Sequence, residues 1–341
     1  MPTIRRIGIL VTLASLFLSP LWAEAESPTL QQPFHDKYAL SLNPFFGFIY
    51  GRSDEILYKY PNKKDHVSLL TWDLKPLIYT GLVLNFGPKD PFRGSGTIAA
   101  ASIKYGLPLE TGTIEDFDWQ YPDNENLTNY SIHNAYSHNA ILADISAGYS
   151  WRLTDKIALG ACGEISYMYF SWSAENGYFQ YLKSYPYTGE IIPGQTWTEN
   201  IPKIYYTGYV MRYTQNWFIA SPAVFLKWKL SRFFSLGGDI GYSPLVFIIA
   251  RDDHLLVGKL FRDYCFFSHY INGGARLAFM PLKALELSLS FHYRYIKEMR
   301  GLSYYLGTGV NATNELYLNG YDGGAGYSAM DMNLSVKVNI F

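Results

Sequence analysis

The sequence is poor in charged residues. Asp, Glu, Lys and Arg make up 17% of its 341 residues, and the formal net charge is −1. Soluble chains usually contain about a quarter of such residues. A protein that binds nucleic acid through a basic surface has a clear excess of Lys and Arg, so the composition excludes this class of partner.

Cysteine is also scarce, since Cys162 and Cys265 are the only two in the chain. Two cysteines are too few for a disulfide scaffold or for a metal site with cysteine ligands. The chain also has no glycine-rich loop of the type that cradles phosphate groups. We therefore expect neither a disulfide-stabilised domain nor a phosphate-binding loop.

Only the N-terminus has a long apolar run, from Ile7 to Leu18, and two arginines precede it. A short basic region, about a dozen apolar residues and a small residue at the exit are typical of a secretory signal peptide. A membrane-spanning helix needs roughly 20 apolar residues, and no later segment is that long. We predict a signal peptide over residues 1–23, with cleavage after Ala23 or Ala25, and an N-terminal segment over 24–35.

Aromatic residues are abundant, with 30 Tyr, 21 Phe and 8 Trp. An exported chain without a helical anchor is either a secreted β protein or an outer-membrane barrel. In residues 285–295 the odd positions are Leu, Phe or Tyr, and the even positions are Glu, Ser, His or Arg; 141–152 and 334–340 alternate likewise. Successive side chains of a strand point to opposite faces, and apolar faces that end in aromatic residues favour the barrel.

The predicted fold is all-β: a ten-stranded antiparallel transmembrane β-barrel over residues 36–341. Tight turns alternate with long polar stretches around 53–64, 113–132, 179–202 and 307–324, which we assign to extracellular loops. An even number of strands places both termini in the periplasm. The predicted strands cover 36–52, 65–86, 94–112, 133–152, 156–178, 203–228, 232–252, 257–280, 283–306 and 325–341.

Two clusters of ionisable residues follow odd-numbered predicted strands. Asp116 and Asp118 come just after the third strand, and Asp252 and His254 end the seventh. Each cluster alone is typical of a solvated loop. Residues i and i+2 of an extended segment share a side, however, and the topology places both pairs at the same mouth of the barrel. Facing each other, they could hold a water molecule.

The alternation of polar and apolar side chains around residue 240 argues against this arrangement. Between 235 and 243 the odd positions are small or polar, which makes them lumenal and would point the even-numbered Asp252 and His254 outward. Pro244 cannot donate a hydrogen bond to the ladder and often marks a bulge. A one-residue bulge there would return both side chains to the lumen.

The chain resembles the omptins, ten-stranded outer-membrane proteases of Gram-negative bacteria, from about Ala39 to its C-terminus. The resemblance is carried by four segments in the same order. They are Gly51-Arg52-Ser53-Asp54-Glu55 in the first outer loop, Leu70-Thr71-Trp72-Asp73 in the second strand, Asp116-Phe117-Asp118-Trp119, and Asp252-Asp253-His254.

The resemblance implies an aspartic-type endopeptidase that activates a water molecule and needs no metal or other cofactor. His254 would be the general base, oriented and made more basic by Asp252. Asp116 and Asp118 would hold the water and the reacting carbonyl from the opposite wall. One of the two would be protonated and would donate a hydrogen bond to the developing oxyanion; the sequence does not say which.

The specificity pocket departs from the family pattern. Omptins cleave between two basic residues, and two acidic groups line their P1 pocket. Glu55 matches the first of these groups, whereas Ala250 occupies the position of the second. The resemblance therefore predicts a basic P1 preference that is weaker or more relaxed than in the family. Cationic peptides or proteins are the expected substrates, because acidic residues surround the mouth.

A second departure concerns lipid. Omptins depend on lipopolysaccharide, whose phosphates bind Arg and Lys on the barrel exterior. The fifth strand reads Ser166-Tyr167-Met168-Tyr169-Phe170, without a basic residue, which argues against the same lipid requirement. We expect a monomer in the outer membrane, with the active site facing the exterior.

Two other functions stay open. One is a catalytically weak or inactive barrel of the same family that acts as an adhesin or a host-protein binder. The other is a small channel, although ten strands leave an interior largely filled by side chains. Charged lumenal residues would fill that interior further: Asp144, Glu286 and Arg294.

Overall fold

The computed structural model describes residues 37–59, 66–119, 126–182, 196–256, 258–282, 285–307 and 317–340. The predicted signal peptide, residues 1–23, and N-terminal segment, 24–35, lie outside these ranges. One compact unit runs from Ala39 to Phe341, and its regular secondary structure in the described ranges is entirely β. The described ranges contain no helix that is long and apolar enough to cross a bilayer.

The described strands differ widely in length, from two residues to about twenty-five. They are β1 (Tyr38–Lys59), β2 (His66–Pro88), β3 (Gly96–Gly106), β4 (Glu110–Asp118), β5 (Asn129–Arg152), β6 (Ile157–Tyr181), β7 (Ile204–Tyr205), β8 (Tyr209–Lys229), β9 (Phe234–Ser243), β10 (Val246–His254), β11 (Lys259–Phe266), β12 (Tyr270–Leu282), β13 (Leu285–Gly307) and β14 (Tyr317–Asn339).

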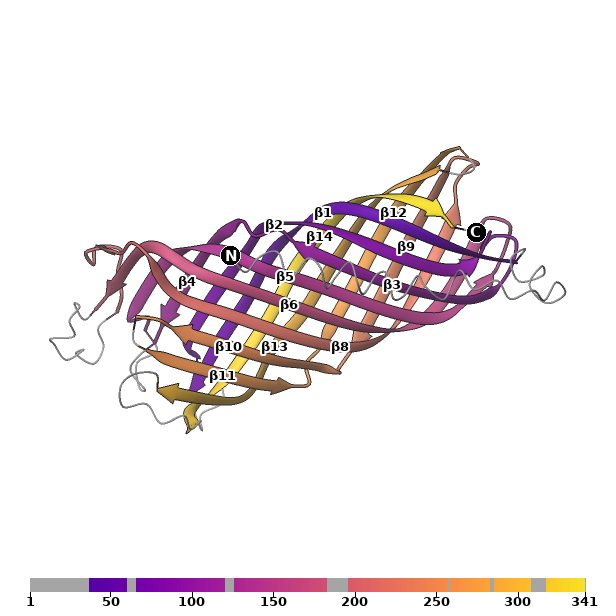
Figure 1. Ribbon diagram of the computed structural model, residues 1–341. Helices are drawn as coiled ribbons and strands as arrows, with labels where there is room; N and C mark the ends of the chain where they lie inside the picture. The colour runs from indigo at the N-terminus through magenta and orange to yellow at the C-terminus, as the bar shows by residue number, and fades with distance from the viewer. Residues whose placement is uncertain are drawn as a thin grey trace, which may run out of the picture. The chain divides into compact units, whose positions relative to one another are not determined.

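The strands form one antiparallel sheet that closes on itself (Figure 1). Three pairs of short strands act as single interrupted spans: β3 with β4 between β2 and β5, β9 with β10 beside β8, and β11 with β12 beside β13. β7 only extends β6. The described strands therefore make ten spans around the ring, and the predicted antiparallel barrel is confirmed. Closure leaves no unpaired edge in the ring.

The interrupted spans distinguish the two ends of the barrel. β4, β10 and β11 lie at one end, which we call the site end, and β3, β9 and β12 lie at the other (Figure 1). The register agrees, because β4 pairs with residues 68–72 of β2 whereas β3 pairs with residues 79–86.

The side chains alternate between the lumen and an outward apolar belt. On β1, outward residues from Phe46 to Tyr50 are well exposed. The next outward position is Arg52, and on β10 the outward Ile249 is likewise followed by Arg251. The change from apolar to charged outward residues marks the edge of the belt that suits lipid. At the site end the strands continue beyond this edge.

The strand register contains the bulge at Pro244 that would turn Asp252 and His254 inward. Along β8 the chain advances four residues from Ala223 to Ile219, while the partner strands advance five, from Gly241 to Val246. One extra residue is therefore inserted where proline cannot donate to the ladder. Odd positions face the lumen in β9 and even positions in β10, so the Asp-x-His segment points inward.

The strands extend further at the site end than predicted. Residues 53–59, 113–118, 129–132 and 317–324, which the sequence assigned to loops, belong to β1, β4, β5 and β14. Beyond the apolar belt both faces of a strand carry polar residues, so the alternation stops before the backbone pairing does. Glu55, Asp116 and Asp118 therefore lie on strands and not in outer loops, which corrects the sequence-based placement.

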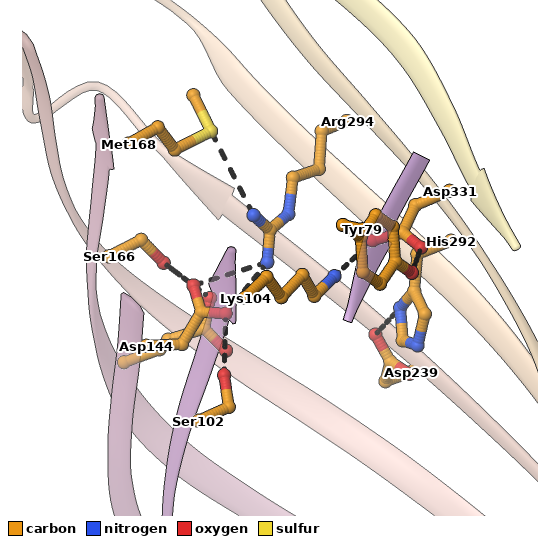
Figure 2. A network of polar contacts seen from close by, with 11 residues as sticks. Tyr79, Ser102, Lys104, Asp144, Ser166, Met168, Asp239, His292, Arg294 and Asp331 are labelled. Carbon is orange, nitrogen blue, oxygen red and sulfur yellow. Dashed lines mark hydrogen bonds and ion pairs between the residues drawn. The ribbon is translucent and has the colours of Figure 1, made fainter. Parts of the chain in front are cut away.

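A buried ion pair crosses the lumen within the apolar belt. Arg294 of β13 donates hydrogen bonds of 3.1 Å to both carboxylate oxygens of Asp144 on β5. The same carboxylate accepts hydrogen bonds from Ser102 and Ser166 at 3.0 and 2.7 Å (Figure 2). The two charged side chains are 12% and 15% exposed. Their predicted place in the lumen is confirmed.

A second ion pair lies beside the first. Lys104 of β3 is bonded to Asp331 of β14, and Asp331 also accepts a hydrogen bond from Tyr79 of β2 (Figure 2). Buried charges are tolerated when they are paired and hydrogen-bonded. The two pairs link strands on different sides of the barrel and occupy the lumen with side chains.

Candidate active site at one end of the barrel

The four ionisable residues selected from the sequence lie at the site end, on two walls of the lumen. Asp116 and Asp118 belong to β4, and Asp252 and His254 belong to β10. Residues two apart on a strand share a face, and Asp116 and Asp252 are buried. The charges of Asp116 and Asp118 both act on the imidazole of His254, so the structure brings the two pairs together.

The imidazole of His254 is held by Asp252. Nε2 of the imidazole contacts Oδ2 of the carboxylate, and the ring of Phe261 packs edge-on at 5.4 Å. Asp252 is 3% exposed, and no described residue hydrogen-bonds its Oδ1. Since Nε2 is engaged, Nδ1 is the ring nitrogen available to a bound molecule.

The carboxylates around His254 make its imidazole more basic. Burial by itself lowers the pKa of a histidine, because desolvation disfavours the imidazolium. The contact with Asp252 and the charges of Asp116 and Asp118 outweigh burial and raise the pKa of His254 to about 9.

Asp116 is shifted toward its neutral form. Burial raises its pKa well above the usual range of a carboxyl, and the nearby Asp118 raises it further, while His254 partly opposes both effects. The only hydrogen bond to its carboxylate among the described residues comes from Ser68, at a long 3.5 Å. No group of three His, Cys, Asp or Glu side chains that could hold a metal ion occurs in the described ranges.

An aromatic layer closes the lumen beneath these residues. Trp72 stacks on Tyr213 and on Trp172, with ring centroids 5.4 and 5.7 Å apart, and all three are almost completely buried. Gln215 lies in the same layer, where it accepts hydrogen bonds from Ser53 and Trp217. Such a wall excludes water, and charges next to it interact more strongly than in solution.

Glu55 of β1 faces the same part of the lumen. It is 7% exposed, and no described residue hydrogen-bonds its Oε2. Burial, followed by the charges of Asp252, Asp263 and Asp116, raises the pKa of Glu55 well above its ordinary value. Ala250 is also buried in this wall but contributes no charge.

The sequence reasoning missed Asp263 of β11. This residue pairs with Ala250 across the β10–β11 hairpin and is 5% exposed. Directly opposed residues share a face of the sheet, so the register of this hairpin would have identified a lumenal carboxylate. Gly258, with a φ of 61°, marks the turn, but one glycine did not fix the register.

Comparisons with known proteins agree with this architecture. The sequence profile described as the Omptin family matches residues 36–339. The crystal structure of the outer membrane protease OmpT from Escherichia coli has a TM-score of 0.75 at 16% identity, over 89% of this chain and 97% of that chain. At this identity the likeness concerns the fold alone.

A second solved structure is much less similar. The outer membrane protein OprG from Pseudomonas aeruginosa is aligned over the same shares of the two chains, with a TM-score of 0.35 and 9% identity. The comparison with curated proteins finds no match.

Proposed function

The chain belongs to the omptin family, and we propose that it is an outer-membrane endopeptidase that hydrolyses peptide bonds with an activated water molecule. The observation that carries this proposal is the His254–Asp252 pair at the site end. The charges of Asp116 and Asp118, across the lumen, help to raise the pKa of its imidazole. A histidine paired with one carboxylate and facing two others is suited to general-base chemistry.

In the proposed reaction His254 takes a proton from the attacking water. Asp252 accepts the hydrogen bond from Nε2, which leaves the lone pair of Nδ1 free to receive that proton. The carboxylate also stabilises the imidazolium that forms. Proton transfer to a positioned histidine contributes about 10²–10⁴-fold to the rate of such reactions.

Asp116 is the proposed partner of the oxyanion. Its raised pKa, caused first by burial and then by Asp118, favours a protonated carboxyl that donates a hydrogen bond as the carbonyl oxygen gains charge. Asp118 then remains to orient the water. The proposal thus assigns the protonated form to Asp116, one of the two alternatives that the sequence left open.

The proposed substrates are cationic peptides or proteins with a basic residue at P1. Glu55 supplies a buried carboxyl group near the reacting groups, and a bound cationic side chain favours its ionised form. The position of Ala250 supplies no such group. Acidic residues at a barrel mouth also raise the local concentration of cationic substrates.

We place the site end outside the cell. Support comes from the connections, because the longer ones, between β4 and β5, β6 and β8, and β13 and β14, leave from the site end, whereas β5 and β6 are joined at the other end by residues 153–156. Long extracellular loops and short periplasmic turns are typical of outer-membrane barrels.

The barrel should hydrolyse peptides without added lipopolysaccharide. Residues 166–170 lack a basic side chain, so this stretch of β6 offers no cation to a lipid phosphate. We expect rates in detergent to change by less than about threefold, the scale of one surface interaction, when lipopolysaccharide is added. A rate that depends on the lipid would contradict this expectation.

The rate of hydrolysis should rise with pH because the neutral form of His254 is the base. With its pKa raised to about 9, most of the imidazole is protonated at neutral pH. Log kcat/KM is expected to increase with a slope of about one below the pKa of His254, and to fall again once Asp116 loses the proton that it donates to the oxyanion. Asp252→Asn removes the carboxylate that raises this pKa, so the rise should move to lower pH; an unmoved profile contradicts the assignment.

Cleavage of a quenched fluorescent peptide by the refolded barrel tests the proposed function. The peptide carries two adjacent arginines, and mass spectrometry of the products locates the cleaved bond. We expect cleavage between the arginines. Binding of the peptide without cleavage would overturn the proposal and would support the alternative of a catalytically inactive binding protein.

A further inference from the structure

Asp263 is a buried carboxylate that the mechanism above does not use. It lies on β11 at the site end, is 5% exposed, and its Oδ1 has no hydrogen-bond partner among the described residues. Its register partner on β10 is Ala250, two residues before Asp252. The side chain therefore enters the lumen next to the proposed catalytic pair.

Asp263 and Glu55 approach the same stretch of β14 from opposite sides. A Cβ on Gly323 would lie 2.4 Å from Oδ1 of Asp263, so this carboxylate occupies the space that the glycine leaves. Ala325, two residues further along β14, is opposite Glu55 on β1. Two residues span about 6.6 Å of strand, and a guanidinium or ammonium group can bridge carboxylates at that spacing.

The wall between the two carboxylates is lined by small residues. Ser303 of β13 is opposite Asp263 and is 1% exposed, and Ala325 is equally buried. Small side chains on these two strands take up little of the lumen between the two carboxylates. Tyr213 of β8 borders the same space. Burial raises the pKa of its phenol, and the charges of Glu55 and Asp263 raise it further.

The two carboxylates lack a positive partner. Among the described residues, no Lys, Arg or His forms an ion pair with Glu55 or Asp263. A buried carboxylate without a counter-charge is unfavourable. Each of these two also has an oxygen without a hydrogen-bond partner among the described residues, so each can accept a hydrogen bond from a bound cation.

We propose that Asp263 and Glu55 together bind the positively charged side chain of the substrate residue at P1, an arginine or a lysine. This inference rests on the proposed function. It assigns the second carboxylate of the P1 pocket to Asp263 of β11. The pocket thereby keeps two carboxylates although position 250 is an alanine. The planar guanidinium presents several donors that can reach carboxylates on two sides.

Paired peptides that differ only in charge test this assignment. One peptide has arginine at P1, and the other has citrulline, the uncharged isostere. In Asp263→Asn we expect kcat/KM for the arginine peptide to fall about 10- to 100-fold, the usual effect of losing a hydrogen bond to a charged group. The value for the citrulline peptide should change much less, so the preference for arginine decreases.

Asp253→Asn is the matched control. Asp253 is on the neighbouring strand β10 at the same end of the barrel but faces outward, where it lies 3.7 Å from Arg251. The substitution removes the same charge from the same end of the barrel without altering the pocket. The preference for arginine over citrulline should stay at the wild-type value in this variant.

Moving the carboxylate separates charge recognition from a structural role. Directly opposed residues have Cβ atoms about 5 Å apart, so the double variant Asp263→Ala, Ala250→Asp returns a carboxylate to the pocket from β10. We expect it to regain most of the preference that Asp263→Ala loses. A merely structural role of Asp263 predicts no such rescue.

Binding measurements keep this inference distinct from the proposed function. If the wild type cleaves neither peptide, the proposed function fails. Titration calorimetry with both peptides still tests whether Asp263 binds the charged side chain. Tighter binding of the arginine peptide that is lost in Asp263→Asn supports the pocket. An arginine-to-citrulline ratio that Asp263→Asn leaves unchanged, in cleavage and in binding, overturns it.

Discussion

Replacing His254 with alanine should lower kcat for hydrolysis of an arginine-containing peptide by about 10²–10⁴-fold, the range attributed to a general base. KM should change much less, because the imidazole acts on the water and not on the substrate side chains. Single-turnover kinetics of the refolded variant measure this effect directly. The barrel should still fold, since the side chain of His254 is 32% exposed at the rim.

His66 provides a control of similar environment. It lies on β2 at the site end, its side chain is 31% exposed, and its Nε2 is 3.0 Å from the carboxylate of Glu298. His66→Ala removes a carboxylate-paired histidine of the same exposure, and kcat should stay within about threefold, as for an ordinary surface substitution. Equal losses in the two variants would mean that His254 is not the base.

Arg294→Met should destabilise the barrel by about 3–5 kcal/mol, the usual cost of leaving one partner of a buried ion pair without its counter-charge. The Asp144 carboxylate would keep the hydrogen bonds from Ser102 and Ser166 but would lose both bonds from the guanidinium (Figure 2). Reversible urea unfolding in detergent, followed by tryptophan fluorescence, measures the change in the free energy of unfolding.

Two further variants identify the cause of that loss. Arg294→Met combined with Asp144→Leu removes both charges and should recover most of the stability, because apolar residues of similar size often replace buried pairs without cost. Arg276→Met breaks a pair with Glu286 in which the arginine side chain is 39% exposed, and should cost about 1 kcal/mol or less. A similar cost for Arg276→Met and Arg294→Met would contradict the role of burial.

The sequence alone determined the architecture of the barrel and the facing of its strands. The two-residue period of a strand is a local property, so the outward face of 285–295 and the lumenal place of Arg294 could be read directly. The bulge at Pro244 was predictable for the same reason, since a proline without an N–H interrupts the ladder. The two ionisable pairs were found because their members are two residues apart.

Only the tertiary structure decided which side chains meet. Glu55 and Asp263 are far apart in the sequence and approach each other because β1 and β11 flank β14 and β13 in the closed ring. The β10–β11 register places Asp263 opposite Ala250, so a carboxylate absent from one strand is present on the next. The extension of β1 and β4 past the apolar belt also depends on backbone pairing between strands, which no local pattern of side chains encodes.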